Sequence, residues 1–571
     1  MRRLTVALTV PTLVATGAVA AVLAAAPSSA SDNGLSIRPA MGWSSWSFVR
    51  RTPTAAKIRA QADAMKNSGL AAHGFVYVNL DDFYQKCDAN GFLVDGFGRW
   101  QVDESKFPGG IKPLADYVHS LGLKFGFYVT PGIAQNAVTR NTPIEGTPYH
   151  AKDIADTSKQ EKNYNCKHMY FINYSKPGAQ EFVDSWARQF ASWGVDYLKI
   201  DGVGAADIPD VQAWDTALRR TGRPINYALS NNLPIANATT WRQLANSWRT
   251  QGDVECYCGP GPNGSGYPLT DWSHVSSRFN STAAWAQYAG PGGWNDYDSL
   301  QLGNGDKVGL TADQRRSHFT LWAMAASPLL LGTDLTNLDA TDMAMLTNDR
   351  LIAVDQDGVA AKRVVNDGSR QVFSKREANG DYVIALFNTA TSGSTTVSVN
   401  FSQVGFSGSA AVTNLWSGAS EGTRTNSYSV SLRPGETRLI RARPTTSGGS
   451  SVEAESGTLA GAARLATCAA CSGGQKVGYI GNGAANYVTV NGVTPSAAGS
   501  RQLTITYLLS GSRSFFVSVN GGAGVEVPLT GTSFATPATT TITVTLNAGA
   551  NSIRFYNNGA YAPDLDKVSV N

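Results

Sequence analysis

Two aspartates at the ends of predicted strands could share nucleophilic and acid–base work on one substrate. Asp201 closes the apolar run 195–201, and Asp253 follows Arg249 two strands later. Lys199 stands two positions before Asp201, so the period of two in a strand places both side chains on one side. A carboxylate beside an ammonium stays ionised at neutral pH, as a nucleophile must. In a retaining glycosidase one carboxyl attacks the anomeric carbon and a second, about 5 to 5.5 Å away, transfers the proton. Asp201 and Asp253 are the candidate pair.

More acidic and aromatic side chains end the neighbouring strands. Asp81 and Asp82 close the second strand, Trp46 closes the first, and Asp298 closes the seventh. Carboxylates accept hydrogen bonds from sugar hydroxyls, and an indole covers the apolar face of a sugar ring. The pattern therefore predicts a carbohydrate site.

Three other interpretations are open for the same residues. Aspartates at strand ends are often helix caps or turn residues. Asp81 and Asp82 could belong to a solvated loop, with the tryptophans in the core. A hard cation usually draws six or more oxygen ligands, and a metal site would have to tolerate Lys199 and Arg249 on the same rim.

The elements that must position these residues alternate between short β-rich runs and longer amphipathic stretches from residue 38 onward. We predict helices over 54–68, 111–121, 177–193, 281–288 and 311–326. The eight predicted strands are 40–46, 75–82, 123–130, 195–201, 225–230, 247–253, 292–298 and 328–332. This order fits a (β/α)8 TIM barrel, whose active site is built at the C-terminal ends of its strands. The alternative, a doubly wound open sheet, gives no reason for acidic residues at so many strand ends.

The length of 571 residues predicts three or four domains, or fewer if one is a large barrel. The barrel takes residues 31–360 of this α/β chain. Residues 361–444 lose the helical period and predict a small antiparallel β-sandwich. A Thr-, Ser- and Gly-rich linker covers 445–451. Residues 452–571 return to short strands with Gly and Asn turns, typical of a β-jelly-roll or sandwich.

Composition and the N-terminal segment bound the class of protein. With 42% apolar and 16% charged residues, the chain is globular, and a formal net charge of +4 gives no electrostatic footprint for nucleic acid. Residues 4–30 carry no charge, follow Arg2 and Arg3, and end in small residues. We expect residues 1–30 to be a secretory signal peptide, with an uncleaved membrane anchor as the alternative. The mature protein is then expected to be extracellular and not membrane-bound.

In an oxidising compartment the six cysteines can form disulfides. No histidine cluster or repeated Cys-x-x-Cys pair accompanies them, so zinc is not expected. The pairing of Cys256 and Cys258 stays open, because a disulfide between them would be short and strained, and long-range pairing is the alternative. The two expected bridges are Cys87–Cys166 and Cys468–Cys471.

Six short sequence motifs also resemble those of a known enzyme family. Over about residues 36–445 the chain resembles the α-galactosidases of glycoside hydrolase family 27. The strings that carry this resemblance are Met-Gly-Trp-Ser-Ser-Trp at 41–46, Tyr-Val-Asn-Leu-Asp-Asp at 77–82, Gly-Phe-Tyr at 126–128, Tyr-Leu-Lys-Ile-Asp at 197–201, Trp-Arg at 248–249 with Asp253, and Ala-Gly-Pro-Gly-Gly-Trp-Asn-Asp at 289–296.

The resemblance implies a retaining mechanism without an organic cofactor. In that mechanism Asp201 matches the nucleophile and Asp253 the general acid/base. Asp81 and Asp82 match acceptors of the 4- and 6-hydroxyls of the sugar, and Trp46 matches the residue beneath its ring. The remaining matches to sugar-contact positions are Tyr128, Lys199, Arg249 and Asp298.

The chain departs from the family pattern where sugar specificity is decided. The family often has Cys-Trp where Phe83 and Tyr84 stand, and a cysteine at Val203, so a familiar disulfide is missing. Ser230 replaces a glutamate that meets the 2-hydroxyl. This change resembles the α-N-acetylgalactosaminidase branch, although the loop 254–268 could supply another carboxylate. β-L-arabinopyranosidases and isomaltose-releasing glucanases also belong to the family.

Carboxylates open and close the C-terminal module, where a sandwich could bring them together as a structural calcium site. The module resembles carbohydrate-binding modules of families 6 and 35. That resemblance assigns the calcium site to Glu453, Glu455 and Asp566, and a sugar-binding surface to Tyr479, Asn482 and Asn558. Ordinary turn residues on a β-sandwich are the alternative for this surface.

The sequence therefore predicts a secreted retaining glycosidase that removes terminal α-galactosyl groups from oligo- or polysaccharides, with the C-terminal module holding the polymer nearby. The competing hypothesis is a noncatalytic sugar-binding protein that kept the barrel groove and lost its chemistry. Both carboxylates and Lys199 argue against that alternative. The oligomeric state stays open.

Overall fold

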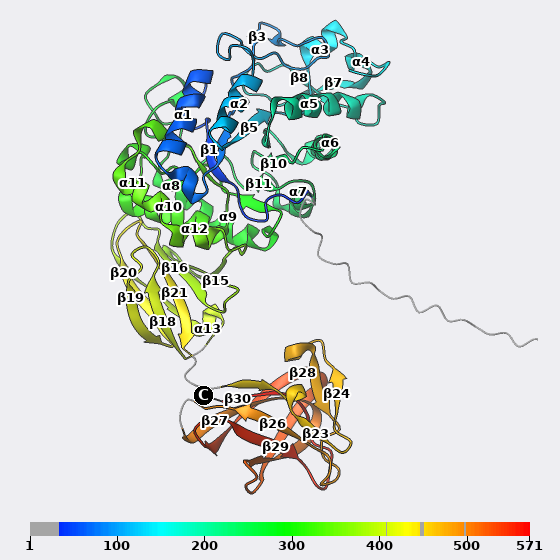
Figure 1. The fold of residues 1–571 in the computed structure, drawn as a ribbon, viewed down its shortest axis with the longest axis vertical. Coiled ribbons are helices and arrows are strands. Elements are labelled where there is room, and N and C mark those ends of the chain that lie inside the picture. The colour runs from blue at the N-terminus through cyan, green and yellow to red at the C-terminus, as the bar shows by residue number, and fades with distance from the viewer. Residues whose placement is uncertain (1–32, 407, 446–449, 496–497, 571) are drawn as a thin grey trace, which may run out of the picture.

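The computed structural model describes residues 33–406, 408–445, 450–495 and 498–570. The predicted signal peptide and most of the predicted linker lie outside the described residues. The chain forms a barrel, then a β-sandwich and then a C-terminal β-domain (Figure 1). Among the described residues, none of the helices combines the length and the apolar character needed to cross a bilayer.

Eight parallel strands form the barrel, as the alternating pattern predicts. Each predicted run contains one of them, and β1 pairs with both β2 and β13. After β12, Leu300 bridges to Leu331 of β13 and closes the ring. The strands are β1 (Met41–Ser44), β2 (Tyr77–Asn79), β5 (Lys124–Val129), β9 (Tyr197–Ile200), β10 (Asn226–Leu229), β11 (Ser247–Arg249), β12 (Trp294–Asp296) and β13 (Leu329–Leu331). The prediction of a (β/α)8 barrel is confirmed.

The register of these strands brings the predicted site residues to one rim. Lys199 lies opposite Tyr128 of β5 on one side and Ala228 of β10 on the other. Asp201 directly follows β9, and its N–H donates to the carbonyl of Val129 at 2.9 Å. The run 247–253 was predicted as one strand, but β11 ends at Arg249, so Asp253 stands on the loop beyond it.

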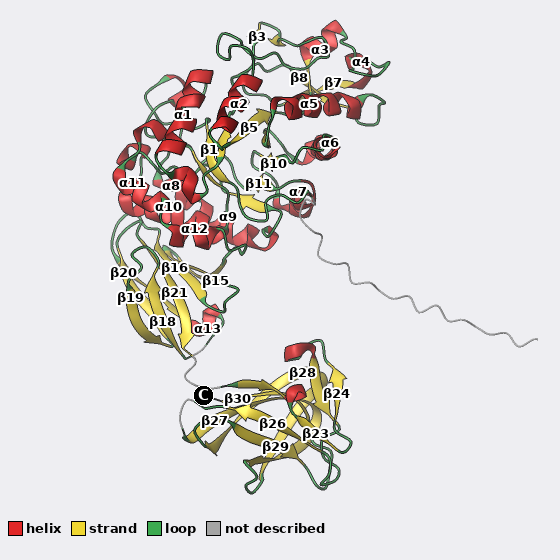
Figure 2. Ribbon diagram, in the orientation of Figure 1, coloured by secondary structure: helices red, strands yellow, loops and turns green. Residues whose placement is uncertain are grey.

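Helices cover the outside of the barrel (Figure 2). Side-chain caps start several of them: Thr54 accepts from the N–H of Lys57, and Thr311 forms a capping box with Gln314. The α-helices of the barrel are α1 (Ala55–Asn67), α2 (Lys112–Ser120), α3 (Gln135–Arg140), α4 (Ala151–Ile154), α5 (Ala179–Trp193), α6 (Ile208–Arg220), α7 (Ala238–Leu244), α8 (Trp272–Ser276), α9 (Arg278–Trp285), α10 (Ala312–Ala325), α11 (Ala340–Leu346) and α12 (Asp349–Asp355).

One predicted helix boundary was wrong. The sequence predicts a helix over 281–288, whereas α9 begins at Arg278 and residues Ala286–Tyr288 form the 3-10 helix η5. The buried side chain of Arg278 donates to the carbonyl of Gly252 on the loop after β11. The backbone is already helical before Arg278, because α8 ends at Ser276 and Ser277 keeps helical φ and ψ, and hydrophobic periodicity does not mark this boundary.

Two excursions from the rim were not predicted. The hairpin β3 (Cys87–Asp88) and β4 (Gly91–Phe92) follows β2, and a small sheet of β6 (Ile133–Ala134), β8 (Met169–Ile172) and β7 (Ala155–Glu161) follows β5. The predicted disulfide Cys87–Cys166 joins them and is confirmed. The two excursions are therefore tied together beside the barrel mouth.

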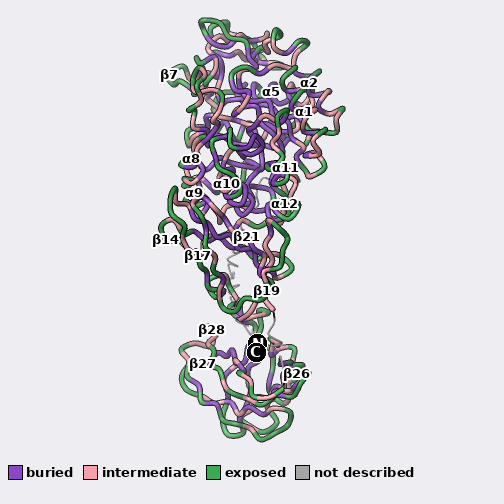
Figure 3. Tube along the Cα trace, turned by 90° about the vertical axis from the view of Figure 1, so that its left-hand side faces the viewer, coloured by how far each residue is buried: buried purple, intermediate pink, exposed green. Residues whose placement is uncertain are grey.

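The β-sandwich packs directly on the barrel. Its larger sheet has the order β14-β15-β16-β21-β18-β19, and β17 pairs with β20. Phe387 on this sheet meets Phe279 of α9 at a centroid distance of 4.9 Å, and Phe373, Phe387 and Leu439 belong to the same hydrophobic cluster as the barrel core. Figure 3 shows buried residues continuing from the barrel into this sheet. The elements are β14 (Lys362–Asp367), β15 (Arg370–Arg376), β16 (Tyr382–Asn388), β17 (Thr395–Asn400), α13 (Phe401–Val404), β18 (Ser409–Asn414), β19 (Ser420–Thr425), β20 (Ser427–Leu432) and β21 (Thr437–Thr445).

The C-terminal β-domain is antiparallel and has its own hydrophobic core, which includes Val488, Phe515 and Phe555. The predicted local bridge Cys468–Cys471 is formed within it. Its strands are β22 (Ser451–Glu453), β23 (Thr458–Ala460), β24 (Arg464–Thr467), β25 (Gln475–Gly478), β26 (Tyr487–Val493), β27 (Gly499–Val519), β28 (Val525–Leu546), β29 (Asn551–Tyr556) and β30 (Asp564–Val570).

Candidate active site

A pocket of about 310 Å³ opens at the C-terminal rim of the barrel, the place predicted for an active site. Three more predicted residues, Ser230, Arg249 and Asp298, line the adjoining cavity below it. The structure thus brings together all ten residues predicted for catalysis and sugar contact in the barrel. The seven on the pocket wall are Trp46, Asp81, Asp82, Tyr128, Lys199, Asp201 and Asp253.

The first predicted carboxylate, Asp201, accepts hydrogen bonds at both oxygens. Its Oδ1 accepts from the N–H of Gly202 at 2.9 Å, and the hydroxyl of Tyr128 lies 3.4 Å from its Oδ2. The direct partner of Lys199 differs from the prediction, because its Nζ lies 2.8 Å from Oδ2 of Asp81. Burial alone would lower the pKa of Lys199, but Asp81 and Asp201 raise it above its ordinary value. The ammonium therefore stays charged between the two carboxylates.

The neighbouring aspartates Asp81 and Asp82 are buried, with 3% and 1% of their surface exposed. Lys199 compensates the charge of Asp81, whereas Asp82 has no cationic partner among the described ion pairs. Burial, together with the nearby charge of Asp81, raises the pKa of Asp82 to about 7. Its Oδ1 accepts from the N–H of Phe83 at 2.8 Å, and its Oδ2 has no hydrogen-bond partner in the described part of the chain.

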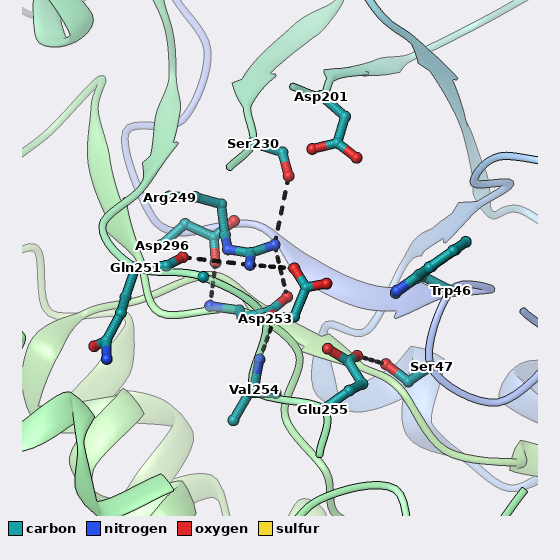
Figure 4. A network of polar contacts seen from close by, with 12 residues as sticks. Trp46, Ser47, Asp201, Ser230, Arg249, Gln251, Asp253, Val254, Glu255 and Asp296 are labelled. Atoms are coloured by element: carbon teal, nitrogen blue, oxygen red, sulfur yellow. Dashed lines mark hydrogen bonds and ion pairs between the residues drawn. The ribbon is translucent and has the colours of Figure 1, made fainter. Parts of the chain in front are cut away.

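The second predicted carboxylate, Asp253, is held at both oxygens. Its Oδ1 lies 2.8 Å from Nη2 of Arg249, and its Oδ2 accepts from the hydroxyl of Tyr257. Burial raises the pKa of Asp253, but Arg249 and the Tyr257 hydroxyl outweigh it and lower that pKa to about 2. In Figure 4 the carboxylates of Asp201 and Asp253 border the same opening, with Trp46 at its side.

Arg249 also joins this rim to the seventh strand. Its Nη1 lies 3.0 Å from Oδ1 of Asp298, whose Oδ2 accepts from the N–H of Val254 at 2.7 Å. One carboxylate oxygen each from Asp253, Glu255 and Asp298 lies within 4.8 Å of the others. Since the guanidinium already occupies two of these three carboxylates, this cluster does not fit a cation-binding site.

Comparison of the sequence with known protein families identifies the family of this chain. Residues 39–160 and 164–357 match the family profile described as alpha galactosidase A, and residues 367–442 match the alpha galactosidase C-terminal beta sandwich domain. The chain belongs to the α-galactosidase family, glycoside hydrolase family 27. This confirms the resemblance inferred from the six strings, and the protein is a glycoside hydrolase.

Several family members show how far the similarity extends. The α-galactosidase of rice is 32% identical over 421 residues, which cover 72% of this chain and 86% of the rice protein. α-Galactosidase A of Cellvibrio japonicus is 34% identical and covers 66% and 83%. The solved β-L-arabinopyranosidase of Geobacillus stearothermophilus is 30% identical with a TM-score of 0.65, covering 72% and 97%. α-Galactosidase I of Mortierella vinacea is 29% identical with a TM-score of 0.58, covering 72% and 98%.

Three pocket residues of this glycoside hydrolase were missed by sequence reasoning. Arg51, Tyr164 and Tyr257 line the pocket from loops rather than strands. Cys256 and Cys258, whose pairing the sequence left open, form a disulfide with each other, and Tyr257 stands between them in the chain. The Cys-Tyr-Cys string was the one signal for this residue in the sequence, while nothing local marks Arg51 or Tyr164.

The loop 254–268 supplies a carboxylate, as the sequence allowed, but not to Ser230. Glu255 accepts from Ser47 and, at 3.3 Å, from Gln301. Burial and the charge of Asp298 raise the pKa of Glu255 well above its ordinary value. Ser230 is buried, and its Oγ lies 3.4 Å from Nη1 of Arg249.

The predicted residues of the C-terminal domain fall into two groups. Ligand oxygens of Glu453, Glu455 and Asp566 lie within 4.8 Å of one another. Tyr479, Asn482 and Asn558 are exposed on neighbouring loops, since Gly481 bridges to Tyr561 and the N–H of Asn482 donates to Ala560. The matched family profiles end at residue 442, so both roles in this domain stay predictions.

The raised pKa of Asp82 predicts a pH-dependent stability. A carboxyl that holds its proton more tightly when folded contributes stability at low pH, and this is lost as the pH rises through about 7. We expect the free energy of unfolding to fall between about pH 5 and about pH 7, and to fall less in Asp82→Asn, whose side chain does not titrate. Denaturant titrations of both proteins at the two pH values measure this, and equal falls would contradict it.

Proposed function

We propose that the protein is a secreted, retaining exo-α-galactosidase in which Asp201 is the nucleophile and Asp253 the general acid/base. The observation that carries the proposal is that both carboxylates line one small pocket, in which Arg249 holds Asp253 and Lys199 stays charged near Asp201. A pocket of about 310 Å³ suits a single terminal sugar. The predicted signal peptide supports secretion.

The proposed reaction is a double displacement. Asp201 attacks the anomeric carbon, the bond to the leaving-group oxygen breaks, and Asp253 gives that oxygen a proton. Asp253, now a carboxylate, takes a proton from water, whose oxygen attacks the same carbon and releases Asp201. Two inversions leave the anomeric configuration unchanged. The ionised Asp253 of the free protein is the form that this second step needs.

Asp81 and Asp82 support galactose as the sugar. The family resemblance gives them the 4- and 6-hydroxyls, and both residues line the pocket. A pentose such as arabinopyranose lacks the 6-hydroxymethyl group. Ser230 specifically favours α-N-acetylgalactosaminides as a second candidate, because its small side chain leaves room for a 2-acetamido group.

A substrate panel with one variant tests this proposal. The wild type is expected to prefer nitrophenyl α-galactoside over the α-N-acetylgalactosaminide, the β-L-arabinopyranoside and dextran. Asp201→Asn is expected to fold and to lose turnover by orders of magnitude, because the covalent step disappears. A mechanism-based fluorogalactoside should label the peptide that contains Asp201, as mass spectrometry would show. Sugar binding without labelling or turnover would instead support the noncatalytic alternative.

The C-terminal domain is proposed to bind carbohydrate. Tyr479 is 48% exposed and stands 6.4 Å from Tyr561, itself 44% exposed, with ring planes at 85°. The guanidinium of Arg464 lies 3.8 Å from the Tyr479 ring centroid. Exposed aromatic faces are typical of sugar contacts, and Asn482 adds polar groups on the same loop.

Removing this domain after residue 445 tests its role. Its core is separate from that of the barrel and sandwich, so the remaining chain is expected to fold. Because the domain would raise the local concentration of a polymer, we expect the rate on polysaccharides to fall and the rate on nitrophenyl α-galactoside to hold. Tyr479→Ala in the full chain should reproduce the loss. Equal losses on both kinds of substrate would contradict this role.

A structural calcium ion is proposed for the second group of residues in this domain. Asp566 is 2% exposed, and its Oδ1, like Oε2 of Glu453 and Glu455, has no hydrogen-bond partner in the described part of the chain. Such oxygens suit a hard cation. Calcium is expected to raise the unfolding temperature of the full chain, and Asp566→Asn to abolish the rise. A calcium-independent unfolding curve for the wild type would argue against the site.

A further inference from the structure

Tyr257 is the single residue enclosed by the Cys256–Cys258 disulfide, and its phenol enters the proposed catalytic pocket. The hydroxyl donates to Oδ2 of Asp253. The indole Nε1 of Trp46 donates to the same hydroxyl at 2.9 Å. Since an indole N–H can only donate, the phenol oxygen is the acceptor there, and the phenol proton is directed to Asp253.

Arg50 and close backbone packing within the loop hold this phenol in place. The guanidinium carbon of buried Arg50 lies 4.5 Å from the ring centroid, and its Nη1 donates to the carbonyl of Gly264 at 3.0 Å. Tyr257 has φ of 50°, a left-handed conformation that costs energy for a residue with a side chain. A Cβ at Gly264 would overlap the Tyr257 carbonyl, so the two backbone segments pack as closely as glycine permits.

This geometry divides the two oxygens of Asp253. Arg249 binds Oδ1 at 2.8 Å, and the phenol binds Oδ2. A donor at a carboxylate oxygen favours the ionised form and fixes the side-chain rotamer. The other groups with an electrostatic influence at Asp253 come from several elements: the cations Arg249, Lys199 and Arg278, the acids Glu255 and Asp298, and the phenol of Tyr164.

We propose that Tyr257, presented by the Cys256–Cys258 bridge, is a positioning residue that fixes the Asp253 carboxylate and favours its ionised form. This inference rests on the proposed role of Asp253 as general acid/base. Tyr257 then favours the second half of the reaction, in which Asp253 takes a proton from water, and limits the fraction of Asp253 that is protonated for the first half.

A ratio of two rates isolates the protonated fraction of Asp253. Cleavage of methyl α-galactoside needs a proton on the leaving oxygen, whereas cleavage of nitrophenyl α-galactoside needs little, because nitrophenolate leaves as an anion. The ratio of kcat/KM for the first substrate to that for the second cancels effects on the nucleophile and on sugar binding. This ratio should be measured for the wild type and the variants at one pH that lies above the pKa of Asp253.

Tyr257→Phe keeps the ring beneath Arg50 and removes the donor to Asp253. The pKa of Asp253 should rise by about one unit, the expected effect of losing a hydrogen bond to a charged group. The rate ratio is therefore expected to increase about three- to tenfold, since a more abundant but weaker acid acts. Cys256→Ser/Cys258→Ser keeps the phenol without its bridge and should move the ratio in the same direction.

Two variants separate this inference from the function on which it rests. Asp253→Asn should lower the ratio by orders of magnitude, and an unchanged ratio there would overturn the acid/base assignment itself. Tyr267→Phe removes a phenol from the same loop whose hydroxyl donates to Asn304 at 2.7 Å rather than to Asp253, and its ratio should equal that of the wild type. A wild-type ratio in Tyr257→Phe, with the expected collapse in Asp253→Asn, overturns the role of Tyr257. A wild-type ratio in the double serine variant overturns the role of the bridge.

Discussion

The guanidinium of Arg249 is the interaction on which the pocket depends. It reaches Asp253 at 2.8 Å and Asp298 at 3.0 Å from a side chain that is 4% exposed. Arg249 ends β11 and pairs in register with Asp296 of β12. A buried charge that loses its partner is strongly destabilising, so the carboxylates and the guanidinium fix one another. The loop after β11 begins from this fixed point.

Burial decides how the many acids of the pocket share few cations. Asp81 and Asp253 have cationic partners in Lys199 and Arg249. Asp82 and Glu255 have none among the described ion pairs, and burial raises the pKa of both. Burial also raises the pKa of Asp81, although Lys199 opposes it, whereas the pKa of Asp253 is lowered. The pocket therefore combines carboxyl groups that hold their protons with different strength. A sugar presents both donors and acceptors of hydrogen bonds, which such a mixed wall can match.

The sequence was sufficient for the barrel and for the residues at its strand ends. Strands such as β9 can be predicted from the local alternation of apolar residues. Parallel strands then bring Asp81 and Asp201 to one rim, independently of the loop conformations. The loop residues were beyond reach because their positions depend on distant partners. Tyr257 is placed by Trp46 and Arg50, and Glu255 by Ser47 and Gln301. The ion pair of Lys199 with Asp81, rather than with its neighbour in the strand, was hidden for the same reason.

The continuous apolar cluster that runs from the barrel through Phe373, Phe387 and Leu439 has a consequence for how such a chain can change over time. A domain that shares its interior with a neighbour cannot be traded by recombination without exposing both, so barrel and sandwich should be inherited as one block. The C-terminal domain closes its own interior. It can therefore be gained, lost or replaced between lineages while the rim that holds Asp201 and Asp253 is left untouched.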